Sequence, residues 1–353
     1  MISSADSLRD LTVALAGTPS LGGDAIRFAA RALLSEAVTL PEKADFLRAL
    51  TARGESAEEI AGLVEAFLEH AVDPALDPAT LPGPMLDVCG TGGDRLHLFN
   101  VSTTSMFVLA AGGAVVVKHG NRSITSQCGG ADVLEALGIP VEQSPEALRE
   151  QVRRTGLGFL FAPLYHPAFK VIGPVRKQLA AEGVATVFNL LGPLLNPARP
   201  AHQLIGIFSK PVLAKYASVL QQLGRQQAWV VHGESSDGQG MDELSTMGPT
   251  DYYTVSPKAI ATARIDRETI AQLGLVPATL EELRGGDRQV NATILRDILS
   301  GTLRGPKRDL VLLNAAAGFV VVGLAGNLAE GLDLAARQID SGRALEKLRA
   351  LQA

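Results

Sequence analysis

The sequence of 353 residues has only two cysteines, Cys89 and Cys128, which form neither a C-x-x-C pair nor a spacing with histidine that suits a metal site. A disulfide framework and a cysteine-held metal centre are therefore not supported, and a reducing compartment, the cytoplasm, is expected. The first residues also lack a basic stretch followed by an apolar one, so no secretory signal is expected.

Long apolar runs and clusters of basic residues are missing as well. The most apolar segment, residues 310–326, contains Asn314 and several glycines, whereas a membrane span needs roughly 20 nearly uninterrupted apolar residues. The segment predicts a buried helix, and no membrane partner is expected. Lys and Arg total 32 against 37 Asp and Glu, which gives a net charge of −5 without a basic cluster, so no nucleic-acid partner is expected.

The residues that are present predict two domains, since a domain usually has about 100–200 residues. Apolar residues at three- and four-residue spacing predict helices that include residues 29–34 and 60–68. Ser56 and Glu59 have the spacing of a capping box at the start of the second helix. Four prolines within 72–84 predict a linker, which divides a helical domain, residues 1–80, from an α/β domain, residues 81–353.

Beyond the linker, short β-prone runs alternate with glycine-rich turns and helical runs, which is the pattern of a mostly parallel sheet with crossover helices. Strands are predicted over 85–88, 114–118, 203–208, 228–232 and 252–255. Helices are predicted over 102–111, 131–137, 211–223 and 308–324. The fold class is therefore α/β.

The strongest chemical motif is Asp87-Val88-Cys89-Gly90-Thr91-Gly92-Gly93-Asp94, followed by Asn100-Val101-Ser102-Thr103-Thr104 where a helix is predicted to begin. Glycines after a strand let backbone N–H groups approach an anion, and a helix N-terminus adds a positive dipole. The spacing matches neither a triphosphate-binding P-loop nor a dinucleotide-binding turn. It predicts a phosphate cradle, that is, a loop that binds phosphate through its backbone. The alternative is a tight strand-to-helix turn that needs glycine only for its backbone conformation.

A second motif, Lys118-His119-Gly120-Asn121-Arg122-Ser123-Ile124-Thr125-Ser126, follows the predicted strand at 114–118. Two cations, an imidazole, an amide and several hydroxyls at the carboxyl end of a strand predict a loop that binds a polyanion. A solvated polar loop is the alternative.

The third motif is an adjacent acidic pair, Asp242 and Glu243, in a loop after the strand predicted over 228–232. Adjacent carboxylates commonly hold Mg²⁺ between a protein and substrate phosphates. The pair alone is weak evidence, because exposed acidic pairs are usually solvated.

Together these motifs resemble those of the anthranilate phosphoribosyltransferases, a family of the nucleoside-phosphorylase-like class, and the resemblance covers nearly the whole chain. Further segments that carry it are Phe161-Ala162-Pro163, His166-Pro167-Ala168, Val175-Arg176-Lys177, Phe188-Asn189-Leu190-Leu191-Gly192-Pro193-Leu194 and Leu313-Asn314-Ala315-Ala316.

The resemblance implies a small all-helical N-terminal domain and a larger α/β domain with a mostly parallel central sheet. It implies a homodimer formed through the helical domain, a site in the cleft between the domains, and a return of the chain to the helical domain at about 165–187. The implied activity transfers the 5-phosphoribosyl group of phosphoribosyl diphosphate (PRPP) to the amino group of anthranilate, in tryptophan biosynthesis. Pyrophosphate is released, and Mg²⁺ is the implied cofactor.

The resemblance also assigns site residues, position by position. PRPP is expected to contact Gly90, Thr91, Gly92, Gly93, Asp94, Asn100, Ser102, Thr103, Lys118, Gly120, Asn121, Arg122, Ser126 and Gly130. Anthranilate is expected to contact Gly90, Asn121, His119, His166 and Arg176, and Mg²⁺ to be held by Ser102, Asp242 and Glu243. The groups expected to act in catalysis are Lys118, His119 and Arg176. Arg176 is expected to hold the acceptor's carboxylate, because a planar guanidinium fits a flat aromatic acid.

Three segments depart from the family pattern: Leu98 stands where threonine is usual, residues 180–186 are longer and lack an arginine, and Gln127-Cys128-Gly129-Gly130 replaces a commoner sequence. These departures leave open a phosphoribosyltransferase with a different acceptor. Two further alternatives are a pyrimidine-nucleoside phosphorylase and a non-catalytic homologue that binds nucleic acid or a metabolite. The acidic pair argues against the phosphorylase, since phosphorolysis needs no diphosphate-bound Mg²⁺, and the acidic net charge argues against nucleic acid.

Overall fold

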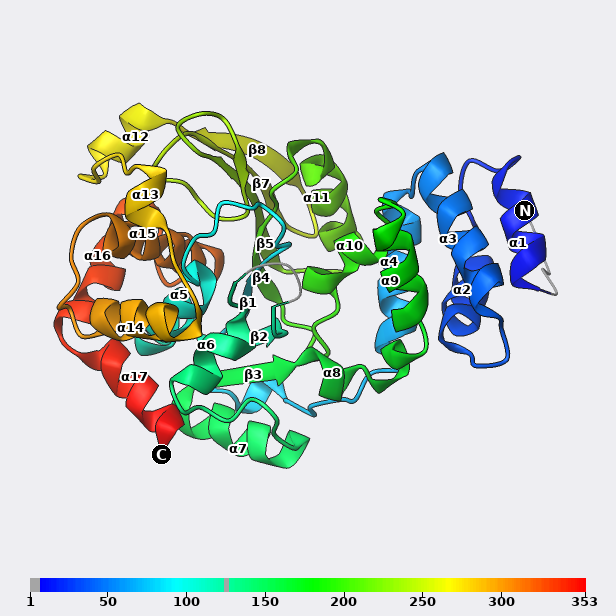
Figure 1. The fold of residues 1–353 in the computed structure, drawn as a ribbon. Helices are drawn as coiled ribbons and strands as arrows, with labels where there is room; N and C mark the ends of the chain where they lie inside the picture. The colour runs from blue at the N-terminus through cyan, green and yellow to red at the C-terminus, as the bar shows by residue number, and fades with distance from the viewer. Residues whose placement is uncertain (1–6, 124–126) are drawn as a thin grey trace.

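A computed structural model describes residues 7–123 and 127–353 of the chain. The N-terminal part is a bundle of helices, drawn in blue in Figure 1, that lies at one side of the sheet-containing part and packs against it through α4. Its helices are α1 (Leu8–Leu15), α2 (Gly23–Leu34), α3 (Leu40–Arg53) and α4 (Ala57–Leu68). Each buries an apolar face in one shared cluster, and that shared burial holds the bundle together.

The capping box expected at the start of α4 is present. The Ser56 hydroxyl accepts a hydrogen bond from the Glu59 N–H at 3.2 Å, and the Glu59 carboxylate accepts one from the Ser56 N–H at 2.9 Å. Glu59 also accepts from the Leu21 N–H at 2.8 Å and pairs with Arg53. The cap therefore also ties the start of α4 to the segment before α2.

A sheet forms the centre of the remaining chain. Its strands are β1 (Met85–Gly90), β2 (Val115–Gly120), β3 (Leu157–Phe161), β4 (His202–Gly206), β5 (Gln227–Glu234), β6 (Gly240–Met241), β7 (Thr250–Val255) and β8 (Ile260–Ile265). The order is β3-β2-β1-β4-β5-β7-β8, with β6 paired to β5. The pairs from β3 to β5 are parallel, whereas β5 with β7 and β7 with β8 are antiparallel.

Helices cover both faces of the sheet. The longer ones are α5 (Val101–Ala111), α6 (Gly130–Ala136), α7 (Pro145–Thr155), α11 (Leu213–Gln222), α12 (Arg267–Gln272), α14 (Arg288–Leu299), α15 (Pro306–Val321), α16 (Leu328–Asp340) and α17 (Arg343–Gln352). The short ones are η1 (Pro78–Thr80), α8 (Ala162–Tyr165), η2 (Pro167–Lys170), α10 (Phe188–Leu191), η3 (Gly192–Leu194), η4 (Lys210–Val212) and α13 (Leu280–Leu283).

Neighbouring residues of one strand point to opposite faces of the sheet. Leu204 and Val231 pack in the cluster with α5 and α15, whereas Ile205 and Val230 pack in the cluster with α11 and the N-terminal helices. The central strands are therefore buried on both sides, which is why they appear in the sequence as apolar runs without alternation.

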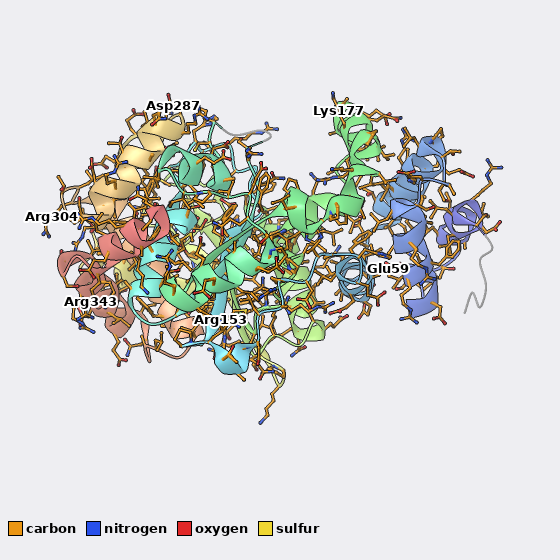
Figure 2. All side chains as sticks on the ribbon, turned by 90° about the horizontal axis from the view of Figure 1, so that it is seen from below. Glu59, Arg153, Lys177, Asp287, Arg304 and Arg343 are labelled. Atoms are coloured by element: carbon orange, nitrogen blue, oxygen red, sulfur yellow. The ribbon has the colours of Figure 1, made fainter. Side chains whose placement is uncertain are left out.

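The segment after β3 carries α9 (Gly173–Ala181), which lies beside the N-terminal helices in Figure 1. Ile172 and Val175 belong to the same apolar cluster as Leu47 of α3. Lys177, labelled in Figure 2, lies on this helix at the same end of the molecule as Glu59. An ion pair between Arg48 and Glu182, with a shortest N···O distance of 2.7 Å, adds a polar contact between the two segments.

Each helix and strand expected from the sequence is present, with ends that differ by a few residues. The strands β3, β6 and β8 and several helices, α7, α14, α16 and α17 among them, were not expected. β3 is a wholly buried run, Leu-Gly-Phe-Leu-Phe, so it has no alternation to mark it. β8 is mostly exposed and buries only Ile265, so it has no apolar run to mark it. Within the described residues, no helix is long and apolar enough to cross a membrane, and residues 306–321 form a buried helix.

Candidate active site

The three sequence motifs lie at one edge of the sheet. β1, β2 and β4 run parallel and end at Gly90, Gly120 and Gly206, so the segments that follow them emerge side by side. The carboxyl edge of such a sheet is where α/β proteins usually bind ligands. One hydrogen bond links the ends of β1 and β4 directly, since the Thr91 N–H donates to the Gly206 carbonyl at 2.9 Å.

The glycine-rich turn after β1 is in direct contact with the acidic pair. Gly92 and Gly93 have φ of 67° and 86°, a region that favours glycine. The Gly92 N–H donates to Asp242 Oδ2 at 2.7 Å, and a Cβ on Gly90 would lie only 2.2 Å from that oxygen. The turn is therefore shaped around the carboxylate of a residue far along the chain.

The N-terminus of α5 meets the other member of the pair. The Ser102 N–H donates to Glu243 Oε1 at 3.1 Å. Lys118, which is 5 % exposed, donates from Nζ to Ser102 Oγ at 3.1 Å and to the Val88 carbonyl. The first and second motifs and the acidic pair thus form one contiguous polar cluster around the start of α5.

The carboxylates of this cluster oppose one another's ionisation. Burial, reinforced by the neighbouring Asp94, raises the pKa of Asp242, and burial together with Asp242 raises the pKa of Glu243. Burial also raises the pKa of Asp94. A bound cation would stabilise all three charges, so the oxygen-rich set of Ser102, Asp242 and Glu243 fits a hard divalent ion.

Among the described residues, no three His, Cys, Asp or Glu side chains are arranged to hold a metal ion by themselves. Mg²⁺ is commonly held by one or two carboxylates together with substrate phosphates. The site therefore fits an ion that arrives with a diphosphate better than a permanently caged one.

Of the remaining residues expected to contact PRPP, some lie together and others are engaged with other side chains. Thr103 and Gly130 are neighbours, since a Cβ on Gly130 would lie 3.2 Å from Thr103 Oγ1. The Arg122 guanidinium lies over the Phe161 ring and forms ion pairs with Glu135 and Glu142 at 2.6 and 2.7 Å. The carboxylates of Glu135 and Glu142 thus accept from Nε and Nη2 of Arg122.

Two more of these expectations concern the loop after β2. The exposed Asn121 uses its Oδ1 to accept from the Arg122 N–H at 2.8 Å. Ser126 lies outside the described residues. A Cβ on Gly120 would lie 2.8 Å from the Phe159 ring, so glycine is needed for the strand end to pack there.

His119 and His166 lie together on the side of this edge that faces the helical part. Their rings are 5.2 Å apart in an edge-to-face arrangement. Burial, and then the neighbouring His166, lowers the pKa of His119 to about 3, and burial lowers the pKa of His166. Both imidazoles are therefore neutral near pH 7.

The hydrogen bonds of the two histidines fix their tautomers. His119 Nδ1 lies 3.3 Å from the Gly192 carbonyl and His166 Nε2 lies 2.8 Å from the Leu195 carbonyl, so these nitrogens must carry the protons. The other nitrogens, His119 Nε2 and His166 Nδ1, are buried and have no partner among the described residues. Each of these two nitrogens offers a lone pair to a donor.

Arg176 lies on α9, and aromatic rings connect its surroundings to this pair, since the Phe169 ring is 5.9 Å from Phe188 and 5.2 Å from His166. Its guanidinium carbon is 5.2 Å from the centroid of the Phe188 ring. The residue is exposed, but the surrounding protein desolvates the guanidinium enough to lower its pKa, and no charged group of the described residues offsets that shift. A cation held over an aromatic ring without a carboxylate partner can bind an anionic ligand.

Several residues that shape the site were not expected from the sequence. Asn314 of α15 accepts from the Leu244 N–H at 2.9 Å and donates to the Leu244 carbonyl at 3.1 Å, which fixes the backbone next to Glu243. The only sign of this role in the sequence is that Asn314 is a polar amide within the apolar segment 310–326. A Cβ on Gly206 would lie 1.6 Å from the Asp242 carbonyl oxygen, a requirement that no local pattern reveals.

Two of the segments that depart from the family pattern, Leu98 and residues 180–186, lie in different parts of the structure. Leu98 forms a bridge with Arg284 and packs partly buried against the core. Residues 180–186 lie against α3 rather than beside the glycine-rich turn, because Glu182 binds Arg48 there.

Two family models match the chain. The helical bundle domain of a glycosyl transferase family matches residues 9–71, and the α/β domain of that family matches residues 82–345. A similar curated protein is the anthranilate phosphoribosyltransferase of Chloroflexus aggregans, 44 % identical over 320 residues that cover 90 % of each chain.

Solved structures are similar over nearly the whole chain. The crystal structure of the Thermus thermophilus anthranilate phosphoribosyltransferase has a TM-score of 0.86 and 39 % identity, and covers 99 % of this chain and 100 % of that one. The Saccharomyces cerevisiae protein in complex with PRPP and Mg has a TM-score of 0.85 and 28 % identity, with 99 % and 97 % covered. The same yeast protein in complex with 4-fluoroanthranilate has a TM-score of 0.82 and 27 % identity, with 98 % and 96 % covered.

Proposed function

The chain belongs to the anthranilate phosphoribosyltransferases, a family of glycosyl transferases, and on that premise we propose that it transfers the phosphoribosyl group of PRPP to anthranilate. The bond from the anomeric carbon to the pyrophosphate oxygen breaks, and a bond to the acceptor's amino nitrogen forms. The amine loses one proton, and pyrophosphate leaves. The reaction belongs to tryptophan biosynthesis.

The observation that carries this proposal is the contact between the acidic pair and two phosphate-binding elements. Asp242 accepts from the turn after β1, and Glu243 accepts from the first turn of α5. An acidic pair would repel a phosphate in the absence of a counterion, so carboxylates directly beside a phosphate cradle imply a cation between the two. The yeast relative that binds PRPP and Mg supports this interpretation.

Ser102, Asp242 and Glu243 would hold Mg²⁺ together with diphosphate oxygens of the donor. When bound, the ion would neutralise charge on the departing pyrophosphate. The chain's own contribution is the ammonium of Lys118, fixed by Ser102 and by the Val88 carbonyl, and the backbone N–H groups of the glycine-rich turn. These groups are held in place before the substrate arrives, so they need little reorganisation during the reaction.

The acceptor would lie between the two histidines and Arg176. The carboxylate of anthranilate would pair with the Arg176 guanidinium, which has no carboxylate partner among the described residues. The amine would donate toward the free lone pairs of His119 and His166. These neutral imidazoles orient the amine while leaving its own lone pair available to attack. The yeast relative bound to 4-fluoroanthranilate supports this class of acceptor.

The same proposal includes the organisation of the molecule. Residues 1–80 and the returning segment at about 165–187 would form one domain, and residues 81–353 the domain that binds PRPP. A homodimer through the helical domain and a cytoplasmic location belong to the proposal as well.

Pyrophosphate release tests the proposed function directly. Purified protein with PRPP and Mg²⁺ is expected to release one pyrophosphate for each anthranilate consumed, and none without anthranilate. Phosphate-dependent cleavage of uridine or thymidine would instead identify a nucleoside phosphorylase. Salt-sensitive DNA binding without pyrophosphate release would identify a non-catalytic homologue.

A further inference from the structure

Asn291 is a buried amide in the first turn of α14, far from the three sequence motifs along the chain. It is 3 % exposed, and both ends of its side chain are occupied. Its Nδ2 donates to Asn100 Oδ1 at 3.0 Å, and its Oδ1 accepts from the Gly286 N–H at 2.8 Å. Asp287, which caps the start of α14, is labelled in Figure 2 and lies at the rim of the α/β part.

The partner of Asn291 is one of the residues expected to contact PRPP. Asn100 precedes α5 but makes no hydrogen bond that caps this helix with its side chain. Instead its Nδ2 donates to the Cys128 carbonyl at 3.1 Å. Because Asn291 presents a donor to Oδ1, the Asn100 amide is fixed with Nδ2 toward Cys128, and one Nδ2 hydrogen is left.

The two amides therefore join three segments. Asn100 lies directly before the helix that presents Ser102, and Cys128 precedes Gly129, the N-cap of α6, whose first residue is Gly130. The third segment is the loop that leads into α14. Two partly buried hydrogen bonds in sequence thus link the three segments at this edge of the sheet.

The backbone around Asn291 packs closely against the segment before α5. The Gly285 N–H donates to the His97 carbonyl at 2.9 Å, and Leu98 and Arg284 form a bridge. A Cβ on Gly285 would lie 2.5 Å from Asn291 Oδ1 and 2.7 Å from the Phe99 Cα. The loop before α14 therefore packs closely against residues 97–100. This segment includes Leu98, which departs from the family pattern.

We propose that Asn291 is a positioning residue for PRPP, which holds the Asn100 amide and, through it, the turns before α5 and α6 in the arrangement that binds the diphosphate. This inference rests on the proposed function. No hydrogen bond of Asn291 reaches Ser102 or the acidic pair within the described residues; its side chain interacts with Asn100 and also with the Cys128 thiol, so Asn100 is the main link to the start of α5.

The variant Asn291→Asp keeps the shape of the side chain but replaces the donor that faces Asn100 Oδ1 with an acceptor. Asn100 must then rotate, and its Nδ2 leaves the Cys128 carbonyl. We expect the KM for PRPP to rise about tenfold, the order of one lost buried hydrogen bond, with the KM for anthranilate little changed. Asn291→Ser, which is smaller and uncharged, gives the same split if the aspartate variant does not fold.

Gln151→Glu is the matched control. Gln151 is also a buried amide paired with another amide, since its Oε1 accepts from Gln143 Nε2 at 2.8 Å and its Nε2 donates to the Leu157 carbonyl at 3.2 Å. It lies on α7, away from the site. We expect it to lower thermal stability without a change in either KM, which separates a positioning role from a general loss of stability.

A double-mutant cycle completes the test, with PRPP affinity measured by calorimetry in the presence of Mg²⁺ on Asn100→Ala, Asn291→Ala and the combined variant. If Asn291 acts through Asn100, the combined variant binds within about twofold of Asn100→Ala alone. Additive losses overturn the positioning role, as does an unchanged PRPP affinity in the Asn291 variants of a protein that binds PRPP normally. A wild-type protein that does not bind PRPP at all overturns the proposed function and this inference with it.

Discussion

At the scale of single residues, the site depends on charges held close together and on groups left without partners. The partly buried acidic pair accepts from two backbone N–H groups yet has raised pKa values, and Arg176 is a cation with no carboxylate partner among the described residues. The first arrangement requires a cation and the second an anion. Mg²⁺ with a diphosphate, and an aromatic carboxylate, meet these two requirements.

Replacing the acidic pair tests the first requirement. Asp242→Asn combined with Glu243→Gln keeps the hydrogen-bond acceptors for Gly92 and Ser102 but removes two negative charges. We expect turnover to fall by at least about a hundredfold and the Mg²⁺ titration to lose its saturating form, because charge neutralisation at the leaving group is lost. An unchanged magnesium titration in the double variant would remove these residues from the metal site.

Replacing the unpaired cation tests the second requirement. Arg176→Ala is expected to raise the KM for anthranilate about tenfold or more, and the KM for PRPP much less, because the guanidinium would contact only the acceptor. Arg176→Lys keeps the charge but not the planar fork, so an intermediate KM is expected. Equal effects on both substrates would count against Arg176 as the carboxylate clamp.

The neutral histidine pair makes a prediction about pH. The folded pKa of His119 is lowered to about 3, below the ordinary value of about 6.5, so the unfolded chain binds the proton more readily. The stability contributed by the neutral imidazole is present above pH 6.5 and is lost as the pH falls from there toward 3. The variant His119→Asn should therefore lose less stability than the wild type between pH 7 and 5 in chemical denaturation. Parallel losses would show that His119 is not held neutral.

At the scale of helices and strands, the sequence predicts an element well where its signal is local. The capping box of α4 is an example, since Ser56 and Glu59 sit at the required spacing and form both bonds. β3 has no such signal, because a strand buried on both faces does not alternate. Asn314 and Asn291 could not be assigned for a related reason, since their partners lie far away in the sequence.

The α4 cap gives a prediction at this scale. Ser56→Ala removes the acceptor for the Glu59 N–H and is expected to cost about 1 kcal/mol of unfolding free energy. Ser144→Ala on α7 is the comparison, since the Ser144 hydroxyl accepts from the Ala147 N–H at 3.3 Å without a reciprocal bond from the third residue of the helix. Denaturant midpoints should show the larger loss for Ser56. An equal or smaller loss would mean that the reciprocal pair adds nothing to the single cap.

At the scale of the whole molecule, the two groups of substrate residues come from different parts of the chain. The polar cluster around Ser102 is built on the parallel sheet, whereas Arg176 is carried by α9 beside the N-terminal helices (Figure 1). The His119–His166 pair lies where these parts meet, and Phe169 continues the contact, with its ring 5.2 Å from His166 and 5.2 Å from Phe67 of α4. Transfer between two substrates therefore depends on both parts being held together.

The central claim is that this chain joins PRPP to anthranilate at the site described, and loss of anthranilate fluorescence tests it most directly. We expect purified protein with PRPP and Mg²⁺ to abolish the fluorescence, a control without Mg²⁺ to leave it unchanged, and Arg176→Ala to slow the loss strongly at low anthranilate concentration. Unchanged fluorescence in a protein that binds PRPP by calorimetry would contradict the claim and would identify a phosphoribosyltransferase with another acceptor.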